Sequence, residues 1–399
     1  MVTTTSEEEN RDPKTTMTDR ERFNAIMHYR SVDRCPICDF GFWDETVPEW
    51  HTQGLPQNVE WKPDAEITTD QWFGMDCYGA GETPDVGLNP LFKSKVLEDR
   101  GDHEVVQQAD GVRVLRKKYM GSIPHHMGHL LTDRDSWREH YLPRLDPTTP
   151  SRFPADWDRA VANWKDPNRE VPITVWAGSL FGWLRDWMGL ENVALVPYDD
   201  PGWFEEMVAT LADCTIAVLT RALEAGARFD SCSMWEDMCY SGGPLLGPEH
   251  FKRFLVPHYR RITDLLHKYG IDVVWIDCDG KIDALLPLWL DAGVNCMFPI
   301  EVGTWGGDPV RYRKEYGRDL LLIGGFDKHV LQASKPEILT EIQRLAPLAA
   351  EGGYIPLPDH RVPPDVPFEN YLYYLREARR IWGHGVNLKP CPALEASTI

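Results

Sequence analysis

Residues 271–301, IDVVWIDCDGKIDALLPLWLDAGVNCMFPIE, contain the pattern that decides the fold. Two short apolar runs, IDVVWIDCDG and VNCMFPIE, enclose a helical stretch near residues 282–291. Short runs that are apolar almost throughout are typical of strands with both faces buried in a parallel sheet. A strand, a helix and a second strand in this order form the repeating unit of a parallel α/β fold.

The same alternation continues on both sides of this unit. Helical stretches lie near residues 203–224, 248–269, 308–316, 335–349 and 366–382, between or after four more strand candidates: VPITVWAG (171–178), FDSCSMWED (229–237), DLLLIGGFD (319–327) and YIPLPDH (354–360). Six strands after residue 170, with two more before it, would complete a single (β/α)8 TIM barrel, which is the α/β fold we predict. An open doubly wound sheet is the alternative, but the sequence lacks both a G-x-G-x-x-G fingerprint and a phosphate-binding P-loop.

The region before residue 170 adds an N-terminal helical extension to the barrel. Residues 1–17 are polar and acidic, which predicts a disordered tail. Thr18 and Glu21 have the spacing of a capping box at the start of a helix. We expect the barrel to span residues 18–385 and a C-terminal tail to follow over residues 386–399.

An inserted β-hairpin is predicted within the same region. HEVVQQ (103–108) and VRVLRKKY (112–119) have strand-like composition, and Asp110-Gly111 between them is a favoured type I′ turn pair. Upstream of the hairpin, residues 33–42 predict the first barrel strand and residues 44–53 predict a helix.

Composition and charge restrict the classes of function. The chain has 399 residues, 42% of them hydrophobic, and a formal net charge of −20. It shows no stripe of basic residues, which argues against nucleic-acid binding. The N-terminus lacks the apolar core of a signal peptide, and no apolar run reaches membrane-spanning length. Nine scattered cysteines, an odd number, favour reduced thiols. We therefore expect a cytoplasmic protein.

Acidic side chains follow almost every predicted strand at its carboxyl end, where the catalytic mouth of a barrel lies. Because crowded carboxylates repel one another, a bound cation, shared protons or basic partners should offset them. Carboxylates with one imidazole form a divalent-metal set. We predict Asp279, Glu301 and His360 as ligands, with Asp277 or Cys278 as a fourth. The alternative is that these residues cap helices or hydrogen-bond at the rim.

Other residues near strand ends are candidates for catalysis and substrate binding. Glu236 or Asp237 would orient the substrate or supply a proton. Aromatic residues crowd one strand end, which suits a flat or apolar ligand, although most of them are expected to be packing. The predicted substrate-binding residues are Trp176, Phe181, Trp183, His126, Asp327 and Phe42.

The sequence resembles the uroporphyrinogen decarboxylase superfamily from Thr18 to about Trp382. The similar segments are TDRERFNAIMHYRSVDRCPICDF, FGMD (73–76), SMWEDMCYSGGPLLGPEHFKRFLVPHY, Asp279-Gly280, AGVNCMFPIE, LLIGGFDKHVL and YIPLPDHRVPPDVPFENY. The decarboxylase proper has an arginine-rich porphyrin-binding signature after its first strand. This chain has Phe40-Gly41-Phe42-Trp43-Asp44-Glu45 there, so the resemblance is closer to the corrinoid-dependent methyltransferase branch.

That branch implies zinc at the barrel mouth and a corrinoid supplied by a carrier protein. The zinc-binding His-x-Cys pair of the branch falls on Asp277-Cys278-Asp279, and its later cysteine falls on His360. An oxygen-rich set suits activation of an ether oxygen better than thiolate generation. The resemblance thus implies an O-demethylase-like methyltransferase that uses a divalent metal, zinc being the first choice, and a small methoxylated substrate.

Two further readings stay open. One is a lyase or decarboxylase that acts on a small carboxylated substrate, with Arg185, Lys328 and Arg361 as a carboxylate clamp. The other is a ligand-binding barrel without catalysis. The sequence also leaves open whether the chain forms a homodimer.

Overall fold

The computed structural model describes residues 16–79, 81–118 and 124–396. Of the predicted N-terminal tail, residues 1–15 lie outside the described residues. The predicted C-terminal tail contains a short helix, α15 (Pro392–Ala396), and a lysine, Lys389, whose Nζ lies 2.6 Å from Asp19 Oδ2. No helix within these described ranges is long and apolar enough to cross a membrane.

A six-stranded parallel sheet forms the centre of the molecule, in the order β14-β13-β12-β11-β8-β7. All six strands predicted after residue 170 are present, which confirms the parallel α/β fold. Their side chains are buried or half-buried, as expected for strands covered on both faces. The strands are β7 (Thr174–Trp176), β8 (Ser231–Trp235), β11 (Val274–Asp277), β12 (Cys296–Phe298), β13 (Leu321–Ile323) and β14 (Tyr354–Ile355).

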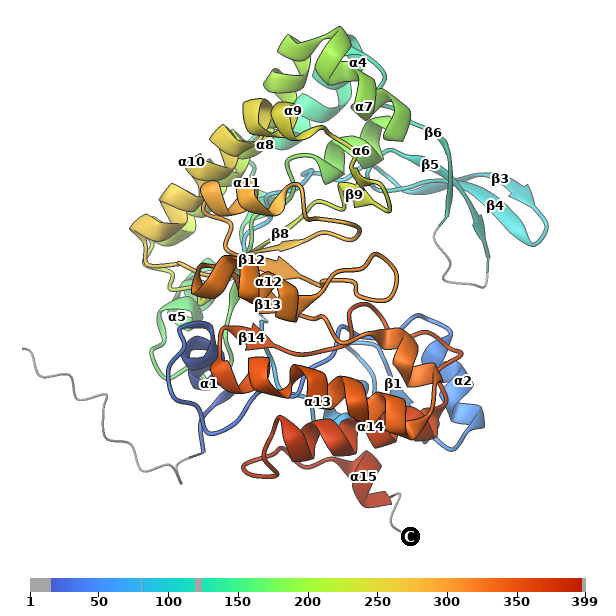
Figure 1. The fold of residues 1–399 in the computed structure, drawn as a ribbon. Helices are drawn as coiled ribbons and strands as arrows, with labels where there is room; N and C mark the ends of the chain where they lie inside the picture. The colour runs from blue at the N-terminus through green and yellow to red at the C-terminus, as the bar shows by residue number, and fades with distance from the viewer. Residues whose placement is uncertain (1–15, 80, 119–123, 397–399) are drawn as a thin grey trace, which may run out of the picture.

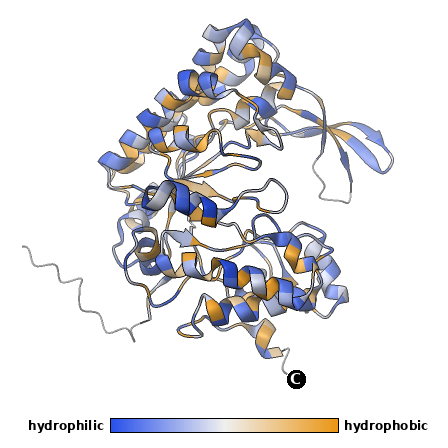
Figure 2. Ribbon diagram, in the orientation of Figure 1, coloured by the Kyte–Doolittle hydropathy of each residue, from blue (hydrophilic) through white to orange (hydrophobic). Residues whose placement is uncertain are grey.

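Helices follow the strands along the chain and cover the outside of the sheet (Figure 1). Orange, apolar segments lie along the strands, whereas the helices alternate blue and orange because one face of each is exposed (Figure 2). The principal helices are α8 (Pro201–Glu224), α9 (Pro248–Phe254), α10 (Val256–Lys268), α11 (Leu286–Asp291), α12 (Pro309–Tyr316), α13 (Lys335–Glu351) and α14 (Phe368–Ile381).

Extended segments before residue 80 lie against both edges of this sheet. Phe42 forms a parallel bridge with Val362, which follows β14. The amide of Asp76 donates to the carbonyl oxygen of Ile37 at 2.8 Å. At the other edge, a Cβ placed on Gly79 would lie 2.2 Å from Oγ1 of Thr174, at the start of β7. The segments around residues 37–42 and 75–79 thus flank the two edges of the sheet. Within the predicted first strand, residues 33–42, Phe42 alone forms a strand-type bridge, so that prediction is not confirmed as a regular strand.

The predicted hairpin is part of a larger antiparallel sheet that projects from the body of the molecule (Figure 1). The four strands have the order β3-β4-β5-β6. They are β3 (Lys95–Arg100), β4 (His103–Gln107), β5 (Arg113–Lys117) and β6 (His125–Gly128). Tyr119, at the end of the predicted second strand, lies outside the described residues.

The turn of this hairpin differs from the prediction. A type I′ turn requires positive φ at both central residues, but Gly111 has a positive φ (+90°) and Asp110 does not. The amide of Gln108 donates to the carbonyl oxygen of Val112 at 2.8 Å, so three residues form the loop. Oδ1 of Asp110 accepts from the amide of Val112 at 3.0 Å, and this local hydrogen bond replaces the predicted two-residue turn.

Shorter elements complete the fold. The predicted helix at residues 44–53 corresponds to α2. The short elements are α2 (Thr46–Thr52), β1 (Val59–Glu60), β2 (Ile67–Thr68), α3 (Thr69–Phe73), α4 (Arg134–Ser136), α5 (Trp157–Lys165), α6 (Gly182–Met188), α7 (Leu190–Asp199), β9 (Cys239–Tyr240), β10 (Gly243–Pro244) and the 3-10 helix η5 (Lys328–Gln332).

The N-terminal helix α1 (Asp19–Met27) begins with the predicted capping box. Oγ1 of Thr18 accepts from the amide of Glu21 at 3.2 Å, and the Glu21 carboxylate accepts from the amide of Thr18 at 3.0 Å. These two hydrogen bonds satisfy backbone donors that the first helical turn leaves unpaired.

We expect Thr18→Ala to lower the free energy of unfolding by about 1 kcal/mol, because one capping hydrogen bond is lost. Urea denaturation followed by circular dichroism measures the difference. Thr18→Ser keeps the hydroxyl and should retain most of the stability. Equal stability of wild type and Thr18→Ala would show that the cap contributes nothing.

Candidate active site

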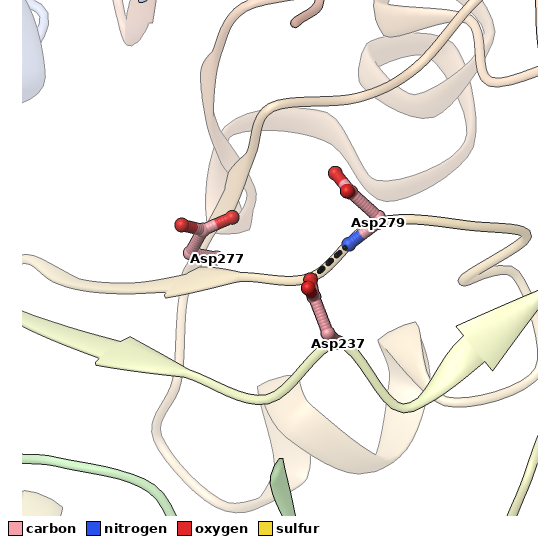
Figure 3. Close-up of side chains that lie close together, drawn as sticks. All are labelled: Asp237, Asp277 and Asp279. Atoms are coloured by element: carbon pink, nitrogen blue, oxygen red, sulfur yellow. Dashed lines mark hydrogen bonds between the residues drawn. The ribbon is translucent and has the colours of Figure 1, made fainter. Parts of the chain in front are cut away.

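Three aspartates lie close together at the carboxyl ends of two neighbouring strands (Figure 3). Asp277 ends β11 and pairs in register with Trp235 at the end of β8. Asp237 follows β8, and Asp279 follows β11. One carboxylate oxygen from each of Asp237, Asp277 and Asp279 lies within 4.8 Å of the others. We call these residues the aspartate triad.

The triad concentrates negative charge in a poorly solvated place. Burial raises the pKa of Asp237 to about 6, and the Asp279 carboxylate adds to this effect. Burial, followed by repulsion from Asp237 and Asp279, raises the pKa of Asp277 well above its usual range. Oδ1 of Asp279 is buried and accepts no hydrogen bond from any described residue. A group that is both anionic and unpaired is costly, so the triad favours a proton or a bound cation.

Backbone geometry directs the members of the triad toward one another. Asp277 and Asp279 are two residues apart, so both side chains project from the same face of an extended segment. Asp237 has a positive φ of +39°, which is uncommon for a residue other than glycine. In this conformation its Oδ1 accepts a hydrogen bond from the amide of Asp279 at 3.0 Å (Figure 3).

Glu301 and His360 lie beside the triad. Nε2 of His360 is 3.4 Å from Oδ2 of Asp279, and Oε2 of Glu301 accepts from the amide of Gly280 at 3.3 Å. Nζ of Lys328 lies 3.3 Å from Oε1 of Glu301, so an ion pair offsets that carboxylate. The predicted ligands Asp279, Glu301 and His360 therefore occupy one region, but the group within 4.8 Å contains Asp237 and Asp277 in place of the last two.

Cys278 does not belong to the triad. Its thiol donates to the carbonyl oxygen of Asp279 at 3.4 Å. Burial, followed by the neighbouring Cys239 thiol, raises the pKa of Cys278 well above its usual range. The Cys278 thiol is directed at the Asp279 carbonyl and is not among the ligand atoms that lie within 4.8 Å of one another. That Cys278 binds a metal stays a prediction.

Glu236 is fully buried and has no oxygen left for a substrate. Its two oxygens accept hydrogen bonds from the amides of Leu180, Phe181 and Gly182, all at 2.8 Å. The hydroxyls of Ser179 and Tyr259 donate to it at 2.8 and 2.7 Å. Five donors use the capacity of a carboxylate. The structure thus argues against the prediction that Glu236 is catalytic, because this carboxylate holds the start of α6 in place.

Two of the predicted substrate-binding aromatic residues belong to the core. Phe42 and Phe181 are 0% exposed. Phe42 packs among Trp50, Phe73 and Tyr371, which corrects its predicted contact with a ligand. Trp176 and Trp183 are half-buried, and Trp183 stacks on Trp187 with ring centroids 5.8 Å apart.

His126 and Asp327 have other partners. His126 is exposed on β6 of the projecting sheet, with its ring 5.4 Å from that of His129. Oδ1 of Asp327 accepts from the amide of His329 at 3.0 Å and caps η5. Neither residue is among the described contacts of the triad.

An aromatic wall around His360 was missed by the sequence analysis. Trp43 stacks on the His360 ring at 5.4 Å, and Phe40 meets it edge-on at 5.2 Å. Phe40 also contacts Phe298, which contacts Trp275. The sequence signal for this wall is the aromatic cluster Phe40-Gly41-Phe42-Trp43. Alternation along an extended segment puts Phe40 and Phe42 on one face, so the pattern does not tell that Phe40 contacts His360 while Phe42 is buried in the core.

Comparisons with known proteins agree with this architecture. A family model described as uroporphyrinogen decarboxylase (URO-D) matches residues 152–381, more than half of the chain. Uroporphyrinogen decarboxylase from Syntrophotalea carbinolica is 28% identical over 191 residues, 46% of this chain and 50% of that protein. The enzyme from Nostoc sp. is 24% identical over 192 residues, 48% of this chain and 51% of that protein. The chain spans about half the length of the curated relatives it matches.

A solved structure extends the likeness over most of the molecule. A methyltransferase from Methanosarcina mazei superposes with a TM-score of 0.55 over 91% of this chain and 98% of that chain. The two sequences are 16% identical, so this likeness concerns the fold alone. Because the family model matches more than half of the residues, the chain belongs to the uroporphyrinogen decarboxylase family.

Proposed function

We propose that the chain is a methyltransferase that moves a methyl group from a small methoxylated substrate to a corrinoid held by a separate carrier protein. The observation that carries this proposal is the aspartate triad, with three carboxylates within 4.8 Å and one unpaired buried oxygen. A site of this kind fits a cation that stabilises a departing oxygen. The fold shared with a methyltransferase from Methanosarcina mazei supports the choice.

The proposal includes a closed eight-stranded barrel over residues 18–385. Support comes from the parallel bridge between Phe42 and Val362 and from the hydrogen bond between Asp76 and Ile37. The close approach of Gly79 to Thr174 supports closure at the other edge. In such a barrel the triad lies at the carboxyl ends of the strands, where the active sites of these enzymes are found.

The donor set fits a hard divalent cation. The side chains that would hold it are Asp237, Asp277 and Asp279, which offer oxygen only, as Mg²⁺ and Mn²⁺ prefer. Zn²⁺, the ion that the family resemblance implies, is usually held by nitrogen and sulfur, and the Cys278 thiol donates elsewhere. When bound, a divalent ion would supply Lewis-acid activation of the ether oxygen.

The residues of this chain would orient the substrate and hold the cation. Asp237 would offer a carboxylate oxygen to the ion, and the departing oxygen would take its proton from solvent. The methyl group goes to the reduced corrinoid, and the substrate leaves as an alcohol or phenol. His360 is fixed by Asp279 and by its stack on Trp43, so it forms an ordered side of the site.

We expect metal removal by a chelator to abolish methyl transfer and Mn²⁺ or Mg²⁺ to restore it. The assay follows the absorbance of the corrinoid carrier with methoxylated aromatic substrates. Cys278→Ser should behave as wild type in this assay, because its thiol donates to the Asp279 carbonyl. Restoration by Zn²⁺ alone, together with loss of activity in Cys278→Ser, would contradict the proposed oxygen site.

Decarboxylation is the competing activity within the family, and the same protein can be tested for release of CO₂. Two of the three bases predicted as a carboxylate clamp are engaged elsewhere, whereas Arg361 lies over the rings of Trp43 and Trp61. Lys328 lies between Glu301 and Asp359, and the guanidinium of Arg185 contacts Asp186 and the Asp237 carbonyl. Release of CO₂ without methylation of the corrinoid would overturn the methyltransferase proposal.

A further inference from the structure

A cavity of about 620 Å³ lies beside the candidate active site. Its walls come from residues 39–41, from Trp61, from α3, from residues 74–79 and from the C-terminal residues 389, 390 and 392. A volume of this size accommodates a small organic molecule. The triad itself is not among its walls.

The charges in this cavity are mainly negative. Three aspartates line it, and among the described lining residues one, Lys389, is basic. Lys389 is held by Asp19 at 2.6 Å and by the carbonyl oxygen of Met75 at 3.0 Å. Asp76 is held by Arg34 at 2.8 Å. Asp39 and Asp70 remain as the carboxyl groups without a basic partner among the described hydrogen bonds.

Asp39 is placed to meet a cation. One of its oxygens accepts a hydrogen bond from the hydroxyl of Tyr371 on α14 at 3.0 Å. Burial raises the pKa of Asp39 to about 7, and the Asp70 carboxylate on α3 adds to the shift. A carboxyl in this state gains its full charge when a cation arrives to pair with it.

Three aromatic rings are also among the residues that line the cavity. Phe40, Trp61 and Tyr78 line the cavity, and ring faces attract organic cations. The guanidinium of Arg361 already lies over the Trp61 ring, 5.0 Å from its centroid, so Phe40 and Tyr78 are the rings left for a ligand. The Phe40 ring also contacts His360, at 5.2 Å. Asp277 contributes to the raised pKa of Tyr78, so that side chain lies close to the triad. The cavity therefore lies near His360 and Asp277.

We propose that this cavity binds the ammonium end of the substrate, so that the substrate is a methoxylated amine rather than a methoxylated carboxylic acid. Asp39 pairs with the ammonium, the rings surround the carbon chain, and the methoxy group reaches the triad. This inference rests on the proposed function for the role of the methoxy end. Selection of a cation by the cavity is independent of that function.

The test compares ligands of one shape and three charges by isothermal titration calorimetry. 4-Methoxyphenethylamine, 2-(4-methoxyphenyl)ethanol and 4-methoxyphenylacetate are each added to the chelated protein without corrinoid. We expect the amine to bind at least about 10-fold more tightly than the alcohol, as for a charge-assisted contact, and the acid to bind most weakly. Equal or tighter binding of the acid overturns the proposal.

Two variants locate the effect. Asp39→Asn should remove most of the preference for the amine and leave binding of the alcohol unchanged. Asp64→Asn is the matched control, because Asp64 is exposed and outside the cavity lining. The wild-type affinity for the amine should also rise between pH 5.5 and 8, as Asp39, which faces Asp70 and Tyr371, loses its proton. An amine preference that survives Asp39→Asn places the cation elsewhere and overturns the assignment.

These outcomes separate the inference from the proposed function. Binding of the amine with no methyl transfer from any methoxylated compound would contradict the methyltransferase and leave the cation site standing. Methyl transfer from methoxylated acids, with no binding of amines, would contradict the cation site and leave the methyltransferase standing.

Discussion

Asp279→Asn is expected to lower the rate of methyl transfer by about 100-fold or more, as losses of groups that stabilise a transition state do. Asp279 supplies the buried oxygen that has no described partner, and its other oxygen contacts His360. Asparagine keeps the shape of the side chain and removes its charge. Single-turnover methylation of the corrinoid carrier at saturating Mn²⁺ measures the loss.

The matched control is Asp291→Asn, which removes an equal charge from a half-exposed ion pair with Arg260 at the end of α11. Its rate should match wild type, and circular dichroism should show both variants folded. A folded Asp279→Asn protein with the wild-type rate would place the chemistry outside the triad.

Glu236→Ala is expected to lower the free energy of unfolding by about 3–5 kcal/mol, the range for removing one partner of a buried charged network. The substitution leaves three amides and two hydroxyls buried without their acceptor. It also removes the anion at the start of α6, where the helix dipole favours a negative charge. The temperature midpoint of unfolding, measured by calorimetry, should fall by many degrees.

Tyr259→Phe provides the graded comparison, because it deletes one of the five donors to Glu236. Its effect should be about 1.5–3 kcal/mol, the value of a hydrogen bond to a charged group. A Glu236→Ala protein of normal stability that fails only in catalysis would show that Glu236 acts on the substrate.

The strands of the sheet could be predicted from the sequence because their composition leaves little choice. Runs such as VNCMFPIE are apolar on both faces and too short for buried helices, so a parallel sheet is their natural place. The capping box at Thr18 was equally local, since its two partners are three residues apart. Because the carboxyl ends of parallel strands lie on one side of the sheet, the acidic residues that follow them could also be expected there.

The individual roles at the rim could not be predicted, because they depend on single backbone angles. Glu236 and Asp237 are adjacent acidic residues with the same apparent function. The positive φ of Asp237 turns its carboxylate to the amide of Asp279, while Glu236 points to the start of α6. Neither the amino-acid composition of a segment nor the periodicity of its apolar residues indicates that a single residue will adopt a positive φ.

The projecting sheet has a consequence for how the molecule opens. Its own apolar cluster contains Val106, Val112 and Val114, and is separate from the main core. Every residue of β3 is exposed. Amide protons of this arm should therefore exchange with solvent through a local opening of low free energy, long before those of β11 or β12. Hydrogen–deuterium exchange would therefore show rapid deuterium uptake in the projecting sheet and slow uptake in the strands of the central sheet.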